Sequence, residues 1–587
     1  MKKILAQLLP AFTNTVVAAD GTKITDISEI NNIPITNLVF DSRQVTKDSL
    51  FFALPGTHID GNVYIAEAIL AGANAVIFQG ELTASQKEDV AHAIIKRTLN
   101  NALSNDEPKF APALINVPEA RFAMAPVSAR FYDNPSERLI VIGVTGTEGK
   151  SSTVSFIWQL LRACGQKAGF ISTVEYSFGG EAIPNPQHQT TPEAPIIQKN
   201  LNEMLENGCK YAVVETSSHG LSTKLNRCGN ILFDCGVFMN VTLEHLEFHK
   251  NFETYRSDKA NLFRALDKHN HIKTIAGEKQ RINSIGIVSL EDPSAEYFAK
   301  ATKRPVYGFT TLGKAGKAAA EGEASNISLP EIPANVKYMK AQNIVSKADG
   351  ISFTVLADGD NSLYNENLSL ATEGKTSSFE VQANLPGAFN TYNLMASITA
   401  VSSVTGLSFS EVAQKVPQLT PIKGRMTVID EGQDFEVIVD YAHTPSSFET
   451  IFPPIKKRIS PDGRIFALFG SGGERDLTKR PLQGQIAAKY CDVVVLADED
   501  PRGEDPVELL KMIAVGAQKE GKIMNENLFI IHDRPSAIRQ TFKMAKKDDI
   551  VLLLGKSHEN SIIYKDYVMP YDEISEARKA LQELKNK

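Results

Sequence analysis

The stretch GVTGTEGKSS, residues 143–152, carries the residue types best suited to holding a phosphate. Glycines at positions 143, 146 and 149 follow an apolar run and precede a Lys-Ser pair. Glycines let backbone N–H groups close around an anion, and a helix that begins at the pair adds partial positive charge. The usual phosphate loop has four residues between its first glycine and the Gly-Lys pair, which is not the spacing here. We therefore expect a phosphate site of another class, rather than an ordinary strand–helix turn, with Lys150 at the outer phosphates and Ser151 on Mg²⁺.

Candidate metal ligands follow this loop along the chain. Glu215 ends the apolar run YAVVE, where a carboxylate is well placed to bind a metal ion held by a nucleotide. His245 and His249 are four residues apart and would share one face of a helix. The third ligand typical of a zinc site is not evident, and two solvent-exposed histidines that bind no metal are the simpler interpretation of this pair taken alone.

A third group of charged residues follows apolar runs in the last part of the chain. Arg475 and Arg502 lie among acidic residues that include Asp500. Two guanidinium groups and a carboxylate at one sheet edge could bind a zwitterion, because the forked guanidinium pairs with a carboxylate and an acid pairs with an ammonium. Taken singly, each residue is equally compatible with a solvated surface charge.

The elements that must position these residues fall into three blocks of an α/β protein. We expect a mixed N-terminal domain over residues 1–136, a central domain over 137–421 with a surface insertion at about 310–333, and a C-terminal domain over 422–587. In the second and third blocks, apolar runs with polar carboxyl ends alternate with helical segments, which predicts parallel sheets. Ligands of such sheets bind beyond the carboxyl ends of the strands.

Composition excludes several classes of function. The net charge is −7 and no basic stripe stands out, which argues against nucleic-acid binding. The five cysteines are scattered, as in proteins of a reducing compartment. The N-terminal MKKILAQLLP favours a short helix over a signal peptide, and no window has the apolar length of a membrane span. We expect a cytoplasmic protein with no membrane or nucleic-acid partner.

Together, the ordered motifs resemble the Mur ligases, the ATP-dependent amino-acid ligases of peptidoglycan synthesis, over nearly the whole chain. The resemblance is closest to the members that add the third residue, a diamino acid, to UDP-N-acetylmuramoyl-L-alanyl-D-glutamate. It implies a UDP-binding domain, a P-loop ATPase-like domain and a Rossmann-like domain in a monomer that uses ATP, two Mg²⁺ ions and a carbamoylated lysine. An acyl phosphate would form on the D-glutamate side-chain carboxylate and be attacked by the amine.

The resemblance assigns the ATP site by motif. The loop supplies Gly146, Thr147, Gly149, Lys150, Ser151 and Ser152, and LPGAFNTYN supplies Asn393 near the base. GRMTVID and VDYAHTP supply Arg425, Asp440, Tyr441 and His443. The metal ligands implied are Ser151 and Glu215 for one ion, and His245 of EHLEFH with carbamoylated Lys259 of SDKANLF for the other. Lys150, Glu215, His245 and Lys259 are thereby the expected catalytic residues.

The substrate contacts are assigned in the same way. DSRQVTKDSLFFALPGTHIDG resembles the uridine-binding segment through Ser42, QTTPEAP supplies Thr190 and Thr191 near the muramoyl peptide, and VVETSSHGL leads to Ser217 and Arg227. GSGGERDLTKRP, DEDPR and GKSHE resemble the amino-acid pocket, with Arg475, Asp500, Arg502, Gly555 and Glu559 on its ligand positions.

Departures from the family pattern bear on activity and on the incoming amino acid. Glu148 stands where the loop usually has Asn, so a carboxylate lies beside the expected triphosphate. Asp500 replaces the Asn of the Asp-Asn-Pro-Arg motif, whereas Arg502 is kept. Two arginines favour meso-diaminopimelate slightly, and the added acid leaves lysine and ornithine open.

Three alternatives remain open at this point. Another Mur ligase would perform the same chemistry with a different amine, although DEDPR and GKSHE argue against it. A catalytically impaired paralogue would bind ATP or the UDP-muramoyl peptide as a regulator, and Glu148 is its only support. A GTPase-type switch requires a guanine-binding motif that the sequence lacks.

Overall fold

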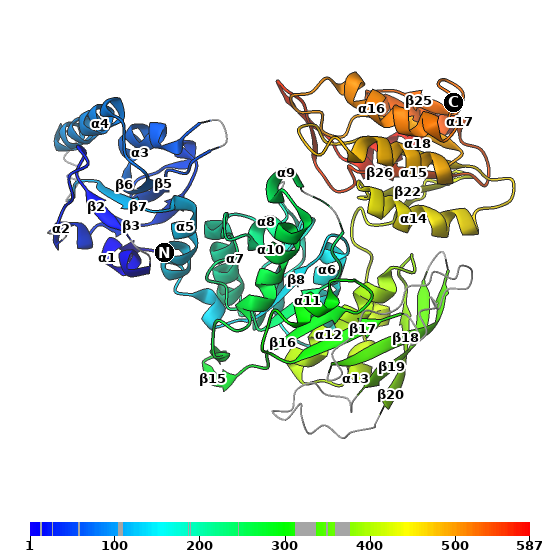
Figure 1. The fold of residues 1–587 in the computed structure, drawn as a ribbon, viewed down its shortest axis with the longest axis horizontal. Coiled ribbons are helices and arrows are strands. Elements are labelled where there is room, and N and C mark those ends of the chain that lie inside the picture. The colour runs from blue at the N-terminus through cyan, green and yellow to red at the C-terminus, as the bar shows by residue number, and fades with distance from the viewer. Residues whose placement is uncertain are drawn as a thin grey trace.

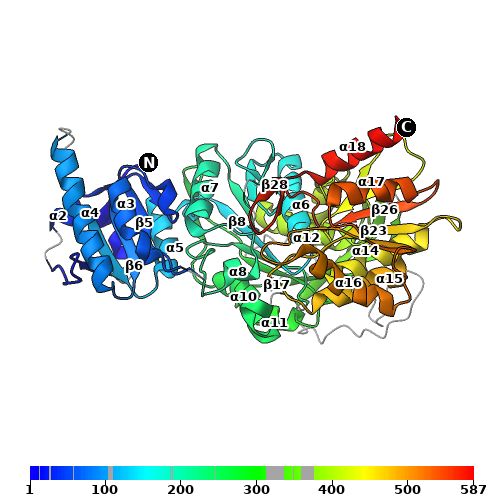
Figure 2. The same ribbon diagram turned by 90° about the horizontal axis from the view of Figure 1, so that it is seen from above.

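The computed structural model forms three lobes that follow one another along the chain (Figure 1). It describes residues 1–586 except 12–13, 26–27, 57–58, 104–109, 186, 188, 243, 245, 312–335, 348–349 and 359–375. The predicted insertion at about 310–333 therefore lies almost entirely outside the described residues. Seen from above, the N-terminal, central and C-terminal lobes form a row (Figure 2).

The N-terminal lobe is built on a five-stranded sheet that is parallel except at one edge. In sheet order its strands are β2 (Thr15–Val17), β7 (Ala113–Val117), β6 (Ala73–Gln79), β5 (Ser49–Phe52) and β4 (Asn37–Val39). Its main helices are α3 (Ile65–Ala71), α4 (Ala84–Leu103) and α5 (Ala120–Phe131). The short helix α1 (Leu5–Leu8) buries Leu5 and Leu8 in this core, as its apolar spacing predicts.

The central lobe has an eleven-stranded sheet whose middle is parallel and whose two ends are antiparallel. Its strands in order are β11 (Ile183–Pro184), β10 (Glu175–Ser177), β9 (Ala168–Ile171), β12 (Tyr211–Glu215), β8 (Ile140–Thr145), β13 (Cys235–Phe238), β16 (Ile285–Ser289), β17 (Val306–Thr310), β18 (Lys337–Ser346), β19 (Ile351–Asp358) and β20 (Thr376–Ala383). Helices α6 (Lys150–Ala163) and α12 (Asn390–Thr405) pack on one face, and α7 (Ala194–Glu206) and α10 (Phe252–Ala265) on the other.

The C-terminal lobe is a six-stranded open sheet covered on both faces by helices. Its strands in order are β21 (Thr427–Ile429), β22 (Glu436–Asp440), β26 (Ile550–Leu554), β23 (Ile465–Phe469), β24 (Val493–Leu496) and β25 (Leu528–Ile530). Helices α14 (Pro445–Arg458), α15 (Lys479–Tyr490) and α16 (Pro506–Lys519) cover one face, and α17 (Arg534–Met544) and α18 (Glu573–Lys585) the other. The apolar runs of this block form its five parallel strands, which confirms the predicted α/β class.

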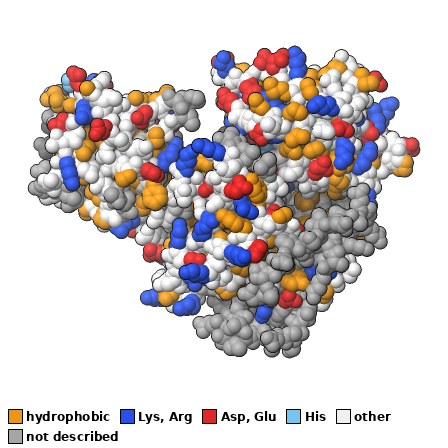
Figure 3. Space-filling model, viewed as in Figure 1, with side chains coloured by type: hydrophobic (Ala, Val, Ile, Leu, Met, Phe, Trp, Pro, Cys, Tyr) orange, Lys and Arg blue, Asp and Glu red, His pale blue; other side chains and the backbone are white. Residues whose placement is uncertain are grey.

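On the face in Figure 3, Lys and Arg side chains are mixed with Asp and Glu, and the surface is hollowed between the N-terminal and C-terminal lobes. None of the described helices combines the length and the apolar composition that crossing a membrane requires. The division at residues 136/137 and 421/422 stays a prediction, although it places each main sheet within one segment.

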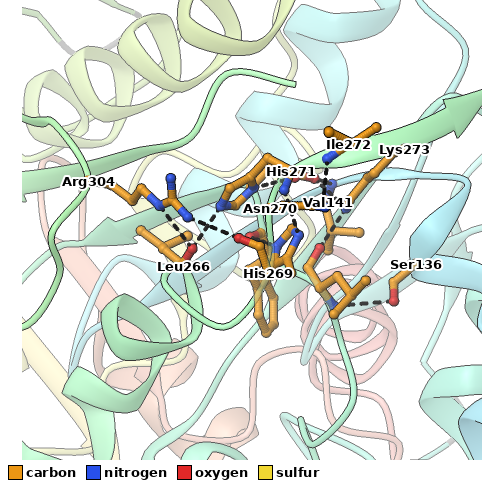
Figure 4. Close-up of polar contacts among 12 residues, drawn as sticks. Ser136, Val141, Leu266, His269, Asn270, His271, Ile272, Lys273 and Arg304 are labelled. Carbon is orange, nitrogen blue, oxygen red and sulfur yellow. Dashed lines mark hydrogen bonds and ion pairs between the residues drawn. The ribbon is translucent and has the colours of Figure 1, made fainter. Parts of the chain in front are cut away.

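A buried polar cluster lies at the end of the central sheet opposite the phosphate loop (Figure 4). The Lys273 ammonium bonds the Asp234 carboxylate at 2.5 Å and donates to two backbone carbonyls. His271 contacts Asp234 through Nδ1 at 2.9 Å and the Leu266 carbonyl through Nε2 at 2.7 Å. Ligand atoms of Asp234, His269 and His271 lie within 4.8 Å of one another, as in a metal site. Each ring nitrogen nevertheless already has a protein partner, so this cluster cross-links strands.

Replacing Lys273 by methionine should lower the free energy of unfolding of the central lobe by about 3–5 kcal/mol, because it leaves Asp234 as a buried charge without its ammonium partner. The exposed Lys279 of the nearby strand β15 (Glu278–Arg281) provides the control, since Lys279→Met should change stability by less than about 0.5 kcal/mol. Urea titration of both variants measures the difference. Equal stability of the two variants would contradict a stabilising role for the cluster.

Candidate active site

The phosphate loop joins β8 to α6 at the carboxyl edge of the central sheet. Thr147 and Glu148 donate their backbone N–H groups to Asn240 Oδ1 at 3.0 and 2.8 Å, which fixes the loop against the residues after β13. Gly149 has a φ of 81° and precedes the first residue of α6. A Cβ at Gly149 would lie 2.8 Å from Asn393 Oδ1, so both the backbone conformation and the close approach require glycine.

Two predicted metal ligands meet beside the loop. The Ser151 hydroxyl donates to Glu215 Oε1 at 3.0 Å, although the two residues are 64 positions apart. Thr173 holds the same carboxylate through its backbone N–H at 2.8 Å and its hydroxyl at 2.9 Å. A hydroxyl and an oriented carboxylate are the hard oxygen ligands that Mg²⁺ prefers, so this pair fits such an ion.

Two lysines approach the same loop from different elements. Lys150 Nζ donates to the Thr147 carbonyl at 2.8 Å, and Lys259 Nζ, on α10, donates to the Gly146 carbonyl at 2.6 Å. Lys259 is 2% exposed, and burial, followed by the charge of Lys150, lowers its pKa well below the usual value. A lowered pKa favours the neutral amine, which is the form that reacts to give a carbamate.

A first cavity of about 460 Å³ lies between the loop and the C-terminal lobe. The predicted nucleotide residues that line it are Gly149, Ser152, Asn393, Arg425 and Asp440. Phe389 and Tyr392 add aromatic surface, which suits a nucleoside. Asp440 accepts the backbone N–H groups of Met426 and Ala442, both at 2.8 Å, so its carboxylate also holds the chain at Arg425 in place.

A second cavity of about 500 Å³ adjoins the first and is lined by residues of both the central and the C-terminal lobes. It unites the predicted residues Thr147, Gly149, Lys150, Ser151, Thr190, Glu215, Arg425, Tyr441, His443, Arg475, Asp500, Arg502 and Glu559. Arg425 Nη2 donates to the Ser151 hydroxyl at 3.3 Å across the lobes. The phosphate loop and the predicted amino-acid pocket therefore share one cavity, although they come from different sheets.

The acids of the amino-acid pocket have a partner that the sequence did not single out. Lys556, almost fully buried, bonds Asp500 Oδ1 at 2.8 Å and also pairs with Glu559. The charge that Asp500 adds is thus offset by an ammonium group. Arg502 has a φ of 54°, in the left-handed region, which is strained for a side chain of its size.

One further acid of this pocket, Glu499, was not predicted. Glu499 Oε2 is buried without a hydrogen-bond partner among the described residues, and burial raises the pKa of Glu499. A Cβ at Gly555 would lie 2.7 Å from that oxygen, which explains the glycine. Lys479 lines the same cavity. By contrast, Arg480, the next residue in the sequence, is buried in a bidentate bond to Glu504.

Some predicted residues lie apart from the two cavities. Thr191 accepts the Ser217 backbone N–H at 2.9 Å, and Arg227 bonds the Thr191 carbonyl at 3.1 Å, so these three form a neighbouring group. Ser42 begins a 3₁₀ turn in the N-terminal lobe. His245 lies outside the described residues. His249, its neighbour in the sequence pattern, contacts Asp258 and Ser218.

Comparison with known proteins finds matches over most of the chain. Family models match successively for the Mur ligase family, catalytic domain (residues 34–132), the Mur ligase middle domain (144–401) and the Mur ligase, glutamate ligase domain (424–557). The UDP-N-acetylmuramyl-tripeptide synthetase of Treponema denticola is 50% identical, covering 93% of this chain and 94% of that protein. The UDP-N-acetylmuramoyl-L-alanyl-D-glutamate--2,6-diaminopimelate ligase of Geobacillus kaustophilus is 31% identical, covering 94% of this chain and 96% of that protein.

A solved structure shows the same fold. It is titled as a UDP-N-acetylmuramoyl-L-alanyl-D-glutamate--2,6-diaminopimelate ligase, covers 100% of both chains, and has a TM-score of 0.55 at 23% identity. The chain therefore belongs to the Mur ligase family and is an ATP-dependent ligase that joins an acid to an amino group in peptidoglycan synthesis.

Proposed function

We propose that this ligase joins a diamino acid to the D-glutamate side-chain carboxylate of UDP-N-acetylmuramoyl-L-alanyl-D-glutamate, through an acyl phosphate formed from ATP. The observation that carries the proposal is that the two cavities adjoin and share lining residues. Both are lined by Glu148, Gly149, Thr242, Arg425 and Ser446. A nucleotide in the first cavity would place its terminal phosphate in the second, beside the pocket for the amine.

The residues of this cavity have separate tasks in the proposed reaction. Lys150 neutralises charge on the transferred phosphoryl group, and Arg425, which reaches Ser151, keeps the C-terminal lobe against the loop. Ser151 and Glu215 would hold one Mg²⁺ ion, and His245 and a carbamoylated Lys259 would hold the other; when bound, these ions would supply further charge neutralisation. The amine attacks the activated carbonyl and phosphate leaves. Closure of the lobes excludes water from the acyl phosphate.

The N-terminal lobe and the group around Thr191 are proposed to hold the UDP-linked substrate. Ser42 would contact the uridine end, and Thr190, Thr191, Ser217 and Arg227 the muramoyl peptide. Glu193 supports this arrangement, because it pairs with Arg227 at 2.9 Å and approaches Arg121 of the N-terminal lobe at 3.6 Å. We further propose that the protein acts as a cytoplasmic monomer.

The charges of the amino-acid pocket favour meso-diaminopimelate over lysine and ornithine. Arg475 and Arg502 line the cavity, and a distal carboxylate would pair with them. Asp500 and Glu559 are partly neutralised by Lys556, so their acidity selects less strongly for a bare ammonium. The names of the two relatives leave this point open, because only one of them specifies an amino acid.

Arg502→Ala should reduce kcat/KM for diaminopimelate at least about tenfold, or roughly 1.4 kcal/mol, and should affect lysine and ornithine less, because only diaminopimelate has a distal carboxylate. ATP-dependent ligation with the three amines in competition measures the preference. Arg502→Lys keeps the charge without the fork and is the matched control, with an intermediate loss. A tenfold preference of the unaltered enzyme for lysine or ornithine would contradict this specificity. Equal losses for all three amines would show that Arg502 does not contact the distal end.

A further inference from the structure

We propose that Glu148 is a positioning residue that couples the phosphate loop to the C-terminal lobe by accepting a hydrogen bond from Thr444. The Thr444 hydroxyl donates to Glu148 Oε1 at 3.0 Å, and the two residues are 296 positions apart. This inference deepens the proposed function and rests on it for its kinetic readout. It assigns a task to the carboxylate at the position where the loop usually has Asn.

The backbone of Glu148 is held entirely by the central lobe. Its N–H donates to Asn240 Oδ1 at 2.8 Å, and its carbonyl accepts from Asn240 Nδ2 at 3.2 Å. The main chain of the loop is thereby fixed, and the side chain alone crosses to the other lobe. Loss of the contact at the far end of this side chain should therefore alter the loop without unfolding it.

Thr444 is equally well anchored in the C-terminal lobe. It is the N-cap residue of α14, where its hydroxyl accepts the Ser447 backbone N–H at 3.1 Å. The preceding residue, His443, is held through its carbonyl by Gln483 of α15 at 2.8 Å. The bond to Glu148 therefore joins the phosphate loop to two helices that pack on the C-terminal sheet.

The position of Glu148 gives this bond a second effect on the nucleotide. The residue lines both cavities, so its carboxylate stands at the boundary that a triphosphate would cross. A carboxylate free to turn toward the phosphates would repel them. Bonding to Thr444 holds the carboxyl group toward the C-terminal lobe. The loop thus favours phosphate most when the two lobes are in contact.

Two neighbouring contacts cross the same interface but do not carry a negative charge on the loop. Thr242 donates to the Ser446 hydroxyl at 3.4 Å, and Arg425 donates to Ser151 at 3.3 Å. These contacts bring the lobes together whether or not Glu148 is present. Arg425 also reaches the loop, but the Glu148–Thr444 bond differs because it fixes the position of a carboxyl group beside the proposed phosphate site.

Substitutions that remove or exchange the hydrogen-bonding groups at positions 148 and 444 test the Glu148–Thr444 bond. Glu148→Gln keeps an oxygen that accepts from Thr444, so kcat should stay within about threefold of the unaltered enzyme. Glu148→Ala should lower kcat about tenfold, with a smaller change in KM for ATP. It should also raise the phosphate released per peptide bond formed, because poorer closure admits water to the acyl phosphate.

Variants at Thr444 give the complementary arm. Thr444→Ser keeps both the cap and the donor and should behave normally. Thr444→Asp keeps the helix cap but places a second carboxylate against Glu148. Its kcat and its ratio of phosphate to peptide should therefore resemble those of Glu148→Ala. Combining Glu148→Gln with Thr444→Asp should restore coupling, because the introduced amide donates to the introduced carboxylate. Such recovery is specific to a direct contact, since independent defects would add.

A readout without catalysis separates this inference from the proposed function. Small-angle scattering of the unaltered protein with a non-hydrolysable ATP analogue should show compaction, and Glu148→Ala and Thr444→Asp should reduce it. If no amine is ligated, the proposed function fails while this measurement still decides the coupling. Unchanged compaction and unchanged phosphate-to-peptide ratio in Glu148→Ala, or no recovery in the double variant, would overturn the inference.

Discussion

Lys150→Met should lower kcat about 10³-fold, equivalent to about 4 kcal/mol of lost transition-state stabilisation. Lys150 opens α6 and lines the cavity that the phosphate loop shares with the amino-acid pocket. Its ammonium is the loop cation placed to meet charge that develops on the transferred phosphoryl group. Methionine keeps most of the unbranched apolar stem and removes the ammonium group with its bond to the Thr147 carbonyl, so the fold should be retained. Steady-state release of phosphate with ATP, UDP-muramoyl dipeptide and the preferred amine measures the loss.

Binding of the UDP-linked substrate, measured by calorimetry without ATP, should be unchanged in Lys150→Met, since Lys150 is not among the residues proposed to hold it. Lys199→Met, an exposed position on α7, is the matched control and should retain full activity. A kcat of Lys150→Met within tenfold of the unaltered enzyme would contradict the assignment of the loop as the ATP site.

Lys259→Ala should lower kcat about 10²–10³-fold, a loss of the size expected when an electrostatic group in an active site is removed. The Lys259 side chain is buried 2.6 Å from the Gly146 carbonyl, near Lys150. An unmodified ammonium there would repel Mg²⁺, whereas a carbamate offers anionic oxygen ligands. Lys259→Glu restores a carboxylate and should recover part of the activity, with Lys259→Gln, which is neutral, as its control.

Direct detection distinguishes carbamate formation from a purely structural role of Lys259. Carbon-13 NMR with labelled bicarbonate should give a carbamate signal in the unaltered protein and none in Lys259→Ala. Absence of the signal in the unaltered, active enzyme would contradict the proposed modification. An equal activity of Lys259→Glu and Lys259→Gln would show that the negative charge is not required.

The sequence was most informative where structure depends on neighbours along the chain. The five apolar runs of the last block were recognisable as strands because a buried parallel strand is apolar on both faces. Leu5 and Leu8 were recognisable as one buried face of a short helix. The phosphate loop was recognisable because glycines followed by Lys-Ser have few other physical uses after a strand. The antiparallel ends of the central sheet gave no comparable local signal.

The sequence by itself determined the α/β class, and it predicted the phosphate loop and the edge of each sheet where ligands would bind, since these follow from local periodicity and from the direction of parallel strands. Only the tertiary structure decided which charges meet. Arg480 is buried against Glu504 and does not face the pocket, Lys556 offsets Asp500, and Glu148 reaches Thr444 in another lobe. Such pairs depend on how sheets and lobes pack. For residues up to 296 positions apart, the sequence around one residue does not indicate its partner.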